Sequence, residues 1–466
     1  MKTTQKQKTT ENNATDPEYL AWKTIFEETH YFLSRPPRYV QEINGEPYDY
    51  SFVEFLRDIH TNNDHVKTWM EDKAKRTYHQ RVFVPYTLKD TSPPNCINTF
   101  KGFRLHAMGL PAKPVSTAWF HNYLRDLVGG NVVLFSFLYD FVADIVQNPQ
   151  RSPELAIVMK GIMGAGKDTL SHIIASLIGY EYKLTTTDFT DLFGSFNSPI
   201  KNKILINVEE VSIQESKKYH ERMKSFITDK QIHIRELYKA KYDATNVLRL
   251  LFSSNNDTPF YVPVGCRRFI VINVSTILKG NTQRFNEIYG NLLKDDVMAS
   301  LFHELLNYDL NPEWNLEKNR PRTKEQISME TENIYPIWKM LDEYLNPENP
   351  NYDPASLKDY VQEIPDTPDG YSYIETGVFT DMFLEFCDRE GNGITKEKFS
   401  KKAMIDNKLR DCEGMQVKVK RFDGEKKNYK YINHAEVVKY MHDQGLLGRK
   451  VAEVKPRTTN EDENVT

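Results

Sequence analysis

The sequence has few cysteines and no long apolar run. Its four cysteines, Cys96, Cys266, Cys387 and Cys412, lie far apart and form no C-x-x-C pair. Neither a disulfide framework nor a cysteine zinc site is therefore expected. A helix that crosses a bilayer needs about 18 or more apolar residues in succession, and no run in the sequence approaches that length. These absences predict a reducing, cytoplasmic setting without a membrane partner.

The sequence also lacks a strong excess of one charge. Its 466 residues carry a formal net charge of -4, with 27% charged and 39% hydrophobic residues, as in an ordinary globular protein of two or three domains. Any binding of nucleic acid must then come from local basic patches. Residues 1–16 lack the apolar centre of a signal peptide and are predicted to be a disordered polar leader.

The first third of the chain is predicted to be helical. Over 17–115, apolar spacings of three and four indicate short helices, followed by a connector rich in Pro and Gly. Over 116–153, the apolar residues recur helically in two segments that are broken at Gly129 and Gly130. This second stretch ends at Pro149 and Pro153, which cannot continue a helix.

Four short apolar runs follow from Leu155. They are "LAIVM" (155–159), "ILINV" (204–208), "LRLLF" (248–252) and "FIVINV" (269–274). Short runs rich in Ile, Leu and Val are typical of strands buried on both faces of a parallel α/β sheet. Helical periodicity returns over 276–345. An α/β domain is therefore predicted over 154–345.

The remainder of the chain is predicted to be a linker, a small domain and a tail. Prolines and aspartates over 346–371 indicate the linker, and the polar residues 450–466 a disordered tail. Over 372–449, two probable helices precede the strand pair "MQVKVKRF" and "KNYKYI", which turns through Asp423 and Gly424. Two helices followed by a hairpin resemble a winged helix.

The predicted hairpin is basic. Residues 415–431 hold six Lys or Arg against two acids, with Phe422, Tyr429 and Tyr431 interleaved. This composition makes it a candidate contact for duplex or origin DNA, and an ordinary exposed hairpin is an equal alternative. The candidate DNA-binding residues are Lys418, Lys420 and Arg421.

A glycine loop lies between the first apolar run and a predicted helix. In "VMKGIMGAGKDTLSHII" (158–174), Gly161, Gly166 and Lys167 have the spacing of G-x-x-x-x-G-K-[ST], and Gly164 lies between them. In such a loop, backbone N–H groups surround phosphate oxygens and the lysine bridges the β- and γ-phosphates. The strand–loop–helix context favours an ATP site over a chance group of glycines.

The loop departs from its pattern at Asp168, where a hydroxyl for the metal ion is usual, and Thr169 follows one position late. A carboxylate beside triphosphate is repelled unless a cation lies between them. Asp168 is therefore predicted to face Mg2+ or its waters, and Thr169 to lie near the phosphates.

Three further segments could complete the site. "ILINVEEVS" ends an apolar run in Glu209 and Glu210, of which the first would lie near the metal and the second would orient or deprotonate a water. "LLFSSNND" places Asn255 and Asn256 directly after another apolar run. Because Asn and Asp are also common turn residues, an ordinary turn is the alternative explanation. Arg267 and Arg268 precede the last run. An arginine from a neighbouring subunit can neutralise a transferred phosphoryl group, whereas a solvated pair is the plain alternative.

These elements, in this order, resemble superfamily 3 helicases, the ring-forming AAA+ motors of viruses, phages and plasmids, and in particular the helicase part of primase–helicases. The likeness covers about Phe83 to Leu341. Besides the glycine loop, it is carried by "VFVPYTLKDTSPPNCINTFKGFRL", "LFGSFNSPIKNKILINVEE", "FITDKQIHIRELYKAKYDATNVLRLLFSSNN" and "CRRF". Cys266 departs from the pattern, because an acidic residue often precedes the arginines.

The resemblance implies an α/β AAA+ P-loop core with a parallel sheet, a helical collar before it (116–153) and a winged-helix-like domain after it (372–449). It makes Lys167 the phosphate lysine, Asn255 the contact to the γ-phosphate and lytic water, and Arg267 or Arg268 the finger. The family's channel hairpin maps to "RELYKAKYDATN" (235–246). Its candidate contacts to DNA are Arg235, Lys239 and Lys241, with Tyr238 or Tyr242 for stacking, and a solvated hairpin is the alternative.

The expected function is therefore ATP hydrolysis, with Mg2+, that drives movement along single-stranded DNA during replication of a virus, phage or mobile element in the host cell cytoplasm. The family implies a homo-oligomer, a hexamer. No acidic primase constellation precedes the collar, so a separate primase or polymerase is the expected partner. Two alternatives remain open, namely a P-loop small-molecule kinase and a non-catalytic AAA+ scaffold.

Overall fold

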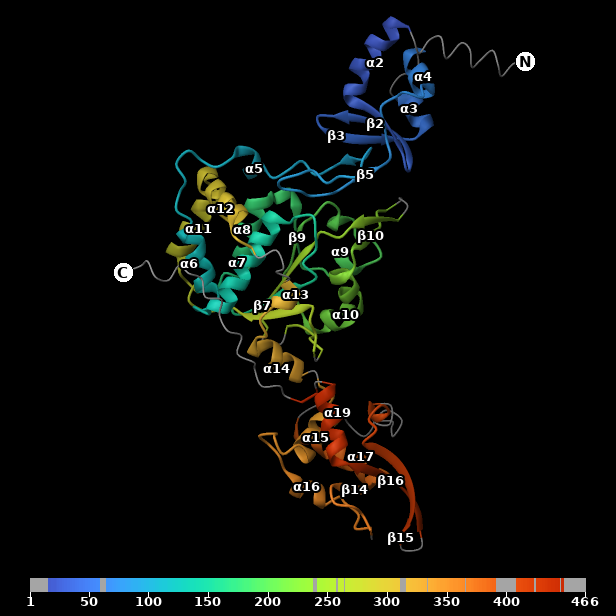
Figure 1. The fold of residues 1–466 in the computed structure, drawn as a ribbon, viewed down its shortest axis with the longest axis vertical. Helices are drawn as coiled ribbons and strands as arrows, with labels where there is room; N and C mark the ends of the chain where they lie inside the picture. Colours follow the sequence, from blue (N-terminus) through green and yellow to red (C-terminus); the bar gives the residue numbers. More distant parts are fainter. Residues whose placement is uncertain are drawn as a thin grey trace, which may run out of the picture.

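The structure, a computed structural model, contains three units that follow one another along the long axis of the molecule (Figure 1). In Figure 1 the N-terminal unit is blue, the central unit cyan to yellow and the C-terminal unit orange to red. The structure describes residues 16–58, 64–237, 241–256, 259–263, 265–310, 316–332, 334–364, 366–390, 408–422, 425–444 and 446–447. In these ranges no helix has both the length and the apolar character needed to cross a bilayer.

The N-terminal unit is a small sheet packed against helices. Its strand order is β3-β2-β1-β4, and Tyr39, Phe55 and Trp69 are buried between the sheet and the helices. Its elements are α2 (Pro17–Thr29), β1 (His30–Ser34), β2 (Pro37–Ile43), β3 (Glu46–Tyr50), α3 (Phe52–Asp58), α4 (Asp64–Glu71) and β4 (Thr77–Tyr78).

The prediction of helices alone in this region is wrong for residues 30–50, which form the antiparallel strands β1, β2 and β3. The turn between β2 and β3 lies at Asn44 and Gly45, whose φ angles are 52° and 78°. Positive φ at both central residues is what a type I′ hairpin turn requires, and Asn-Gly is its preferred sequence. This local turn signal outweighs the helical spacing of the aromatic residues.

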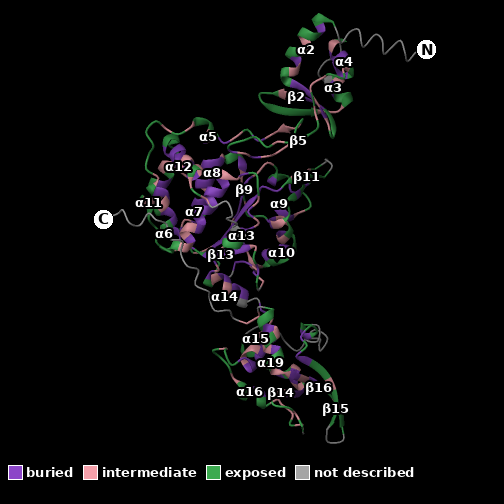
Figure 2. Ribbon diagram, viewed as in Figure 1, coloured by how far each residue is buried: buried purple, intermediate pink, exposed green. Residues whose placement is uncertain are grey.

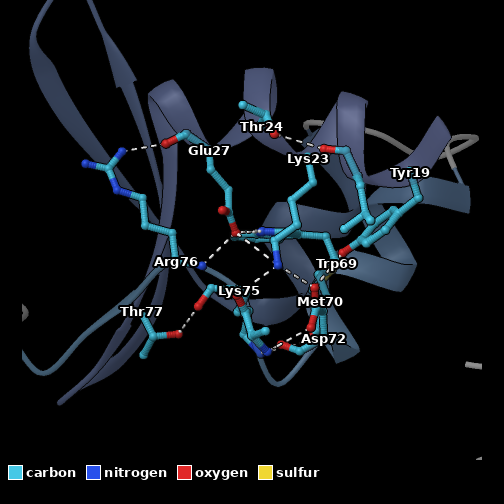
Figure 3. Close-up of polar contacts among 12 residues, drawn as sticks. Tyr19, Lys23, Thr24, Glu27, Trp69, Met70, Asp72, Lys75, Arg76 and Thr77 are labelled. Carbon is cyan, nitrogen blue, oxygen red and sulfur yellow. Dashed lines mark hydrogen bonds and ion pairs between the residues drawn. The ribbon is translucent and has the colours of Figure 1, made fainter. Parts of the chain in front are cut away.

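A set of polar contacts joins α2 to α4 and to the segment that leads into β4 (Figure 3). Asp72 accepts hydrogen bonds from the Tyr19 hydroxyl at 2.9 Å and the Lys23 ammonium at 2.7 Å. Glu27 accepts from the Trp69 indole N–H at 2.7 Å and from the backbone N–H of Arg76 at 2.6 Å. Because the groups are partly buried and paired, they fix the helices against each other without leaving a buried charge unpaired.

The connector and a pair of helices follow. The connector contains β5 (Arg81–Val82), β6 (Ile97–Asn98) and α5 (Arg104–Met108), and the two helices of the predicted collar segment are α6 (Ala118–Leu127) and α7 (Val132–Gln147). The helical prediction for this second stretch is confirmed, including its break, since Gly129 and Gly130 both have positive φ. The Asn131 side chain caps α7 by accepting from the N–H of Leu134 at 3.1 Å.

The central unit is a five-stranded parallel sheet in the order β13-β7-β12-β9-β8. Its strands are β7 (Ala156–Lys160), β8 (Lys183–Thr186), β9 (Leu205–Val208), β12 (Arg249–Ser254) and β13 (Phe269–Asn273). All four predicted strands are present. Strand β8 was not predicted, because it is a half-polar edge strand, "KLTT", without an apolar run. The mixed α/β class with a parallel sheet is thus confirmed.

Helices cover both faces of this sheet. Ile157 and Met159 of β7 belong to one core cluster with α6, α7, α8 and α12, whereas Ala156 and Val158 belong to a second with α9 and α10. Figure 2 shows the buried residues concentrated in these layers. The helices of the unit are α8 (Lys167–Ile178), η1 (Tyr180–Tyr182), α9 (Thr190–Phe193), η2 (Ser198–Ile200), α10 (Ile213–Thr228), α11 (Thr282–Leu292) and α12 (Asp295–Asn307), and a hairpin of β10 (Gln231–Ile234) and β11 (Tyr242–Thr245) precedes β12.

The C-terminal unit is a three-stranded antiparallel sheet, in the order β14-β16-β15, packed against helices. Its elements are β14 (Tyr371–Glu375), α17 (Thr376–Arg389), β15 (Met415–Phe422), β16 (Glu425–Asn433) and α19 (His434–Asp443), and it is preceded by α13 (Leu316–Asn319), α14 (Lys324–Glu332), α15 (Pro336–Leu345) and α16 (Pro354–Lys358). The predicted strand pair and the first predicted helix are present. The second, over 395–407, and the turn at Asp423 and Gly424 lie outside the described residues.

The predicted linker is more ordered than its composition indicates. The short helix α16 lies within 346–371, and Leu357 is buried in the same core cluster as α15 and α17. The Asp353 side chain caps α16 by accepting from two backbone N–H groups. Helix α15, within the range predicted for the α/β domain, also packs into this C-terminal cluster. Local capping and burial therefore fold a segment whose prolines alone suggest a linker.

Candidate active site

The glycine loop joins β7 to α8, as its spacing predicts. Gly164 and Gly166 have φ angles of 77° and 90°, in the left-handed region that favours glycine. A Cβ on Gly166 would also lie 3.1 Å from Leu278 Cδ1 and 3.6 Å from the Phe285 ring. Glycine is therefore required at 166 both by the backbone conformation and by the wall behind it. The N–H groups of such a loop and of the first turn of α8 make the kind of concave donor site that anions prefer.

Lys167 is buried, with 5% of its surface exposed. Its ammonium donates to the carbonyl of Gly161 at 2.7 Å, to that of Ile162 at 2.9 Å and to Asn255 Oδ1 at 2.8 Å. Burial lowers the pKa of Lys167, and the charge of Asp168 opposes this shift. An ammonium has three donors, and phosphate oxygens in the loop would compete for them with these three neutral acceptors.

Asn255 meets Lys167 because of the strand order. Strand β12 lies between β7 and β9, so the residues that follow these three strands meet at the carboxyl edge of the sheet. Asn255 follows β12 and Glu209 follows β9. The turn after β9 is tied to β12 by a hydrogen bond from the N–H of Val211 to the carbonyl of Ser253 at 3.1 Å. The structure therefore gathers the glycine loop, the asparagine and the first glutamate at one edge.

The carboxylate of Asp168 points toward this edge. Its Oδ1 accepts a hydrogen bond from the Ser253 hydroxyl at 2.9 Å, and Glu209 Oε1 accepts from the Asn207 amide at 2.8 Å. Burial, followed by the charge of Asp168, raises the pKa of Glu209. In the described part of the chain no group of three or more His, Cys, Asp or Glu is arranged to hold a metal. Asp168 and Glu209 are only two carboxylates, but carboxylate oxygens are the protein donors that Mg2+ prefers.

Glu210 is exposed and has a φ of 56°. A non-glycine residue in this region is strained unless its surroundings fix it. The hydrogen bond of the next residue to β12 fixes it here. The positive φ of Glu210 turns the chain at this point. As a result, Glu209 is half-buried beside Asn207, whereas Glu210 is exposed.

Thr169 is buried, and its hydroxyl lies 3.4 Å from that of Tyr289 on α11. Three residues near the loop were not predicted from the sequence. They are Tyr289, Tyr123 of α6, whose hydroxyl donates to the Gly166 carbonyl at 3.0 Å, and Lys183 of β8. Burial lowers the pKa of Lys183, whereas the charges of Glu209 and Asp168 raise it. No motif marks these residues, because only the packing of other elements brings them to the loop.

The arginine pair lies elsewhere. Arg267 and Arg268 precede β13, whose first residue, Phe269, is in register with Ala156 at the start of β7. They therefore lie at the amino edge of the sheet, opposite the edge that carries the glycine loop. Arg267 is exposed and Arg268 is half-buried. The structure does not bring either arginine to the glycine loop of the same chain.

The β10–β11 hairpin carries Arg235 and Lys241, both exposed, whereas Tyr238 and Lys239 lie outside the described residues. Asn197 fastens a preceding loop to the hairpin, because its side chain donates to the His233 carbonyl at 2.9 Å and accepts from the Arg235 N–H at 2.9 Å. The adjacent Phe196 is 46% exposed, and its ring lies 5.2 Å from the Arg235 guanidinium. In the Phe-Asn pair of the "LFGSFNSP" segment, Phe196 therefore places an exposed ring beside the hairpin, and Asn197 anchors the segment to the hairpin.

The C-terminal hairpin has a face of tyrosines and lysines. Tyr431 contacts Tyr371 and Tyr373, with ring centroids 5.0 and 4.7 Å away. The ammonium of Lys418 lies 3.3 Å from the centre of the Tyr431 ring, and that of Lys420 lies 5.5 Å from that of Tyr373. This tyrosine–lysine face is opposite Ile374 and Ile432, which belong to the core.

The three predicted DNA contacts of this hairpin do not share one face. Successive side chains of a strand point to opposite faces, so Arg421 points away from Lys418 and Lys420. Tyr429, one of the aromatic residues interleaved in the predicted basic hairpin, is only 2% exposed. The side chain of Phe422 lies outside the described part.

Comparisons with known proteins agree with this architecture. Residues 159–268 match a family model described as a family of unknown function, DUF5906. A DNA primase-polymerase of Nitratiruptor phage NrS-1 is 25% identical over 177 residues, which is 36% of this chain and 24% of the relative. The apo structure of the NrS-1 C terminal region (305-718) matches with a TM-score of 0.61, at 16% identity over 87% of this chain and 95% of that one.

The chain has the fold of that C-terminal region. An A form apo structure of the same region matches with a TM-score of 0.59, at 17% identity over 86% of this chain and 96% of that one. In sequence, however, the match spans only about a quarter of the primase-polymerase, 24% of its length.

Proposed function

We propose that this chain is a phage replication protein that acts as an ATP-dependent, ring-forming DNA helicase of the AAA+ class, in the host cytoplasm. The observation that carries the proposal is the convergence of Lys167, Asp168, Glu209 and Asn255 at one edge of a parallel sheet. The similarity to a phage DNA primase-polymerase supports the assignment to replication. We also propose a separate primase or polymerase as a partner, because the similar protein is a DNA primase-polymerase.

The nucleotide is proposed to be ATP with Mg2+. Backbone N–H groups of the glycine loop and the Lys167 ammonium hold phosphate oxygens, and Thr169 lies beside them. Asp168 and Glu209 hold the metal, whose charge offsets that of the phosphates when it is bound. Glu210 orients and deprotonates the attacking water, and Asn255 contacts the γ-phosphate and that water. Each role uses a residue at the carboxyl edge of the sheet.

The arginine pair supports a ring rather than a monomer. Arg267 and Arg268 precede β13 at the amino edge, so they cannot complete the site of their own chain. One of them is proposed to act on the phosphates of a neighbouring subunit, where a guanidinium would stabilise the transferred phosphoryl group. We therefore propose a homo-oligomer, by resemblance a hexamer, in which neighbouring subunits share each site.

Single-stranded DNA is the proposed substrate of the β10–β11 hairpin. Arg235, Lys241 and Lys239 contact phosphates without reading the sequence. Phe196 beside the hairpin and Tyr242, 46% and 38% exposed respectively, offer rings on which bases can stack. Lys418 and Lys420 of the tyrosine–lysine face are the proposed contact for duplex or origin DNA.

The test is an ATPase assay of the full chain with and without single-stranded DNA, together with fork unwinding and oligomer size. A helicase predicts hydrolysis that DNA stimulates, unwinding, and assembly in the presence of ATP and DNA. Phosphorylation of a nucleoside monophosphate would instead identify a kinase. Absence of both activities would leave a scaffold and refute the proposed motor.

Asp168 offers a more specific prediction. Asp168→Ser is expected to keep ATPase within about threefold, because serine supplies the usual metal-binding hydroxyl, whereas Asp168→Ala should raise the Mg2+ concentration for half-maximal activity about tenfold, the equivalent of about 1.4 kcal/mol. The measurement is a Mg2+ titration at saturating ATP. Ser253→Ala is the matched control, because it removes the hydrogen-bond partner and keeps the carboxylate. An Asp168→Ala enzyme that matches wild type at every Mg2+ concentration would exclude a metal role.

The tyrosine–lysine face can be tested by its asymmetry. A Lys418→Ala/Lys420→Ala variant is expected to bind DNA about tenfold more weakly at low salt, and its log Kd against log salt should lose a slope of about two, since each lysine contacts about one phosphate. Arg421→Ala is the control, because this residue points to the other face of the same strand. An equal loss in both variants would show that a diffuse charge, and not this face, binds DNA.

A further inference from the structure

The glycine loop rests against a wall built from outside the sheet. Tyr123 of the collar helix α6 is fully buried, and its hydroxyl donates to the carbonyl of Gly166 at 3.0 Å. Leu278 and Phe285 lie against the same glycine. The wall is tied together by a hydrogen bond from the Ser275 N–H to the Leu127 carbonyl at 2.9 Å.

The contact falls on the peptide that carries a phosphate donor. Gly166 is the N-cap of α8, with φ 90° and ψ 13°, and its carbonyl shares a rigid peptide plane with the N–H of Lys167. In a trans peptide these two groups point in opposite directions. Holding the carbonyl toward α6 therefore holds the Lys167 N–H away from α6, on the side of the loop where the phosphates are expected.

The Tyr123 hydroxyl is suited to a permanent donor role. Burial raises its pKa well above the ordinary value for tyrosine, and nearby Tyr289 and Asp168 add to this. The raised pKa favours the protonated hydroxyl, which is the form that donates to the Gly166 carbonyl. Gly166 is the N-cap of α8 and lies against Leu278 and Phe285, and these neighbours limit the backbone changes that could break the contact.

We propose that α6 positions the phosphate-binding loop through Tyr123, so that nucleotide binding and the packing of the collar on the core are coupled. The inference rests on the proposed nucleotide site. Tyr123 is a positioning residue, because it acts through the Gly166–Lys167 peptide. Coupling is reciprocal, so nucleotide bound in the loop should also stabilise α6. A conformational change in α6 or in its neighbours would in turn alter the affinity of the loop for phosphate.

The test compares Tyr123→Phe with Tyr139→Phe in the full chain. Both variants keep a buried ring and lose one hydroxyl hydrogen bond, but Tyr139 lies on α7 and donates to Glu304 at 2.7 Å, away from the loop. Tyr123→Phe is expected to raise the Kd for ADP and for ATP about tenfold, and Tyr139→Phe to leave both within about twofold. The second readout is hydrogen exchange of Ala118–Leu127, which ADP should slow in wild type and in Tyr139→Phe but much less in Tyr123→Phe.

The outcomes separate this inference from the proposed function. Wild-type protein that binds neither ADP nor ATP would refute the nucleotide site itself. Wild type that binds, together with a Tyr123→Phe variant of unchanged Kd and unchanged ADP protection, would refute the coupling alone. Equal loss of thermal stability and equal change of Kd in both tyrosine variants would show a general packing effect and would also overturn the proposal.

Discussion

Replacing Lys167 by Ala is expected to abolish ATP hydrolysis, with a fall of about 100-fold or more in kcat, because a preorganised charge at a transition state typically contributes this much. The wild-type ammonium is already held at the loop by Gly161, Ile162 and Asn255, so it need not be recruited from solvent. Alanine supplies neither the charge nor the reach. The measurement is steady-state ATPase with single-stranded DNA, accompanied by fork unwinding.

The matched control is Lys203→Ala. Lys203 also donates its ammonium to a backbone carbonyl, that of Glu181 at 2.7 Å, but it precedes β9 at the amino edge of the sheet. Its removal should change ATPase less than about twofold. If Lys167→Ala keeps more than half of the wild-type rate, while its thermal stability is unchanged, the glycine loop is not the nucleotide site.

Replacing Glu210 by Gln is expected to have the second large effect, on hydrolysis but not on binding. Removing a general base typically lowers kcat by about 100-fold to 10,000-fold, whereas the isosteric amide leaves the loop and the metal ligands in place. The Kd for ATP should therefore stay within about twofold of wild type. Burst and steady-state ATPase, with a separate measurement of ATP affinity, check both parts.

Two further variants assign the roles of the acidic pair. Glu209→Gln should instead raise the Mg2+ requirement, since the half-buried carboxylate beside Asp168 is the proposed metal ligand. Glu221→Gln, an exposed glutamate of α10 paired with Lys224 at 2.8 Å, is the control and should behave as wild type. A Glu210→Gln enzyme with normal turnover would remove Glu210 from the mechanism and would direct attention to Glu209.

The sequence was informative where local chemistry and burial agree. The four apolar runs became β7, β9, β12 and β13 because each is buried on both faces of a covered sheet. The glycines at 164 and 166 mark left-handed backbone, which few other residues adopt. In the N-terminal unit, by contrast, the spacing of aromatic residues fits both a helix and a strand, because the segments are short. The Asn44–Gly45 turn favours the strand pair, and the structure has strands there.

The candidate site divides in the same way. The sequence by itself determined where the glycine loop, the acidic pair and the asparagine lie, because each follows an apolar strand and parallel strand ends carry such residues to one edge. The strand order, which sets β12 between β7 and β9, had to come from the family resemblance or from the structure. Pairing across the sheet is a non-local choice that no short segment encodes.

Only the tertiary structure decided what surrounds these motifs. It turned Asp168 toward Ser253, set Arg267 and Arg268 at the opposite edge, and separated Arg421 from Lys418 and Lys420 by the alternation of one strand. It also brought Tyr123 to Gly166 from a helix more than forty positions earlier in the chain. A local motif indicates the chemistry that a residue can supply. The partner that the residue contacts depends on the packing of distant segments, and this packing is encoded by residues throughout the core.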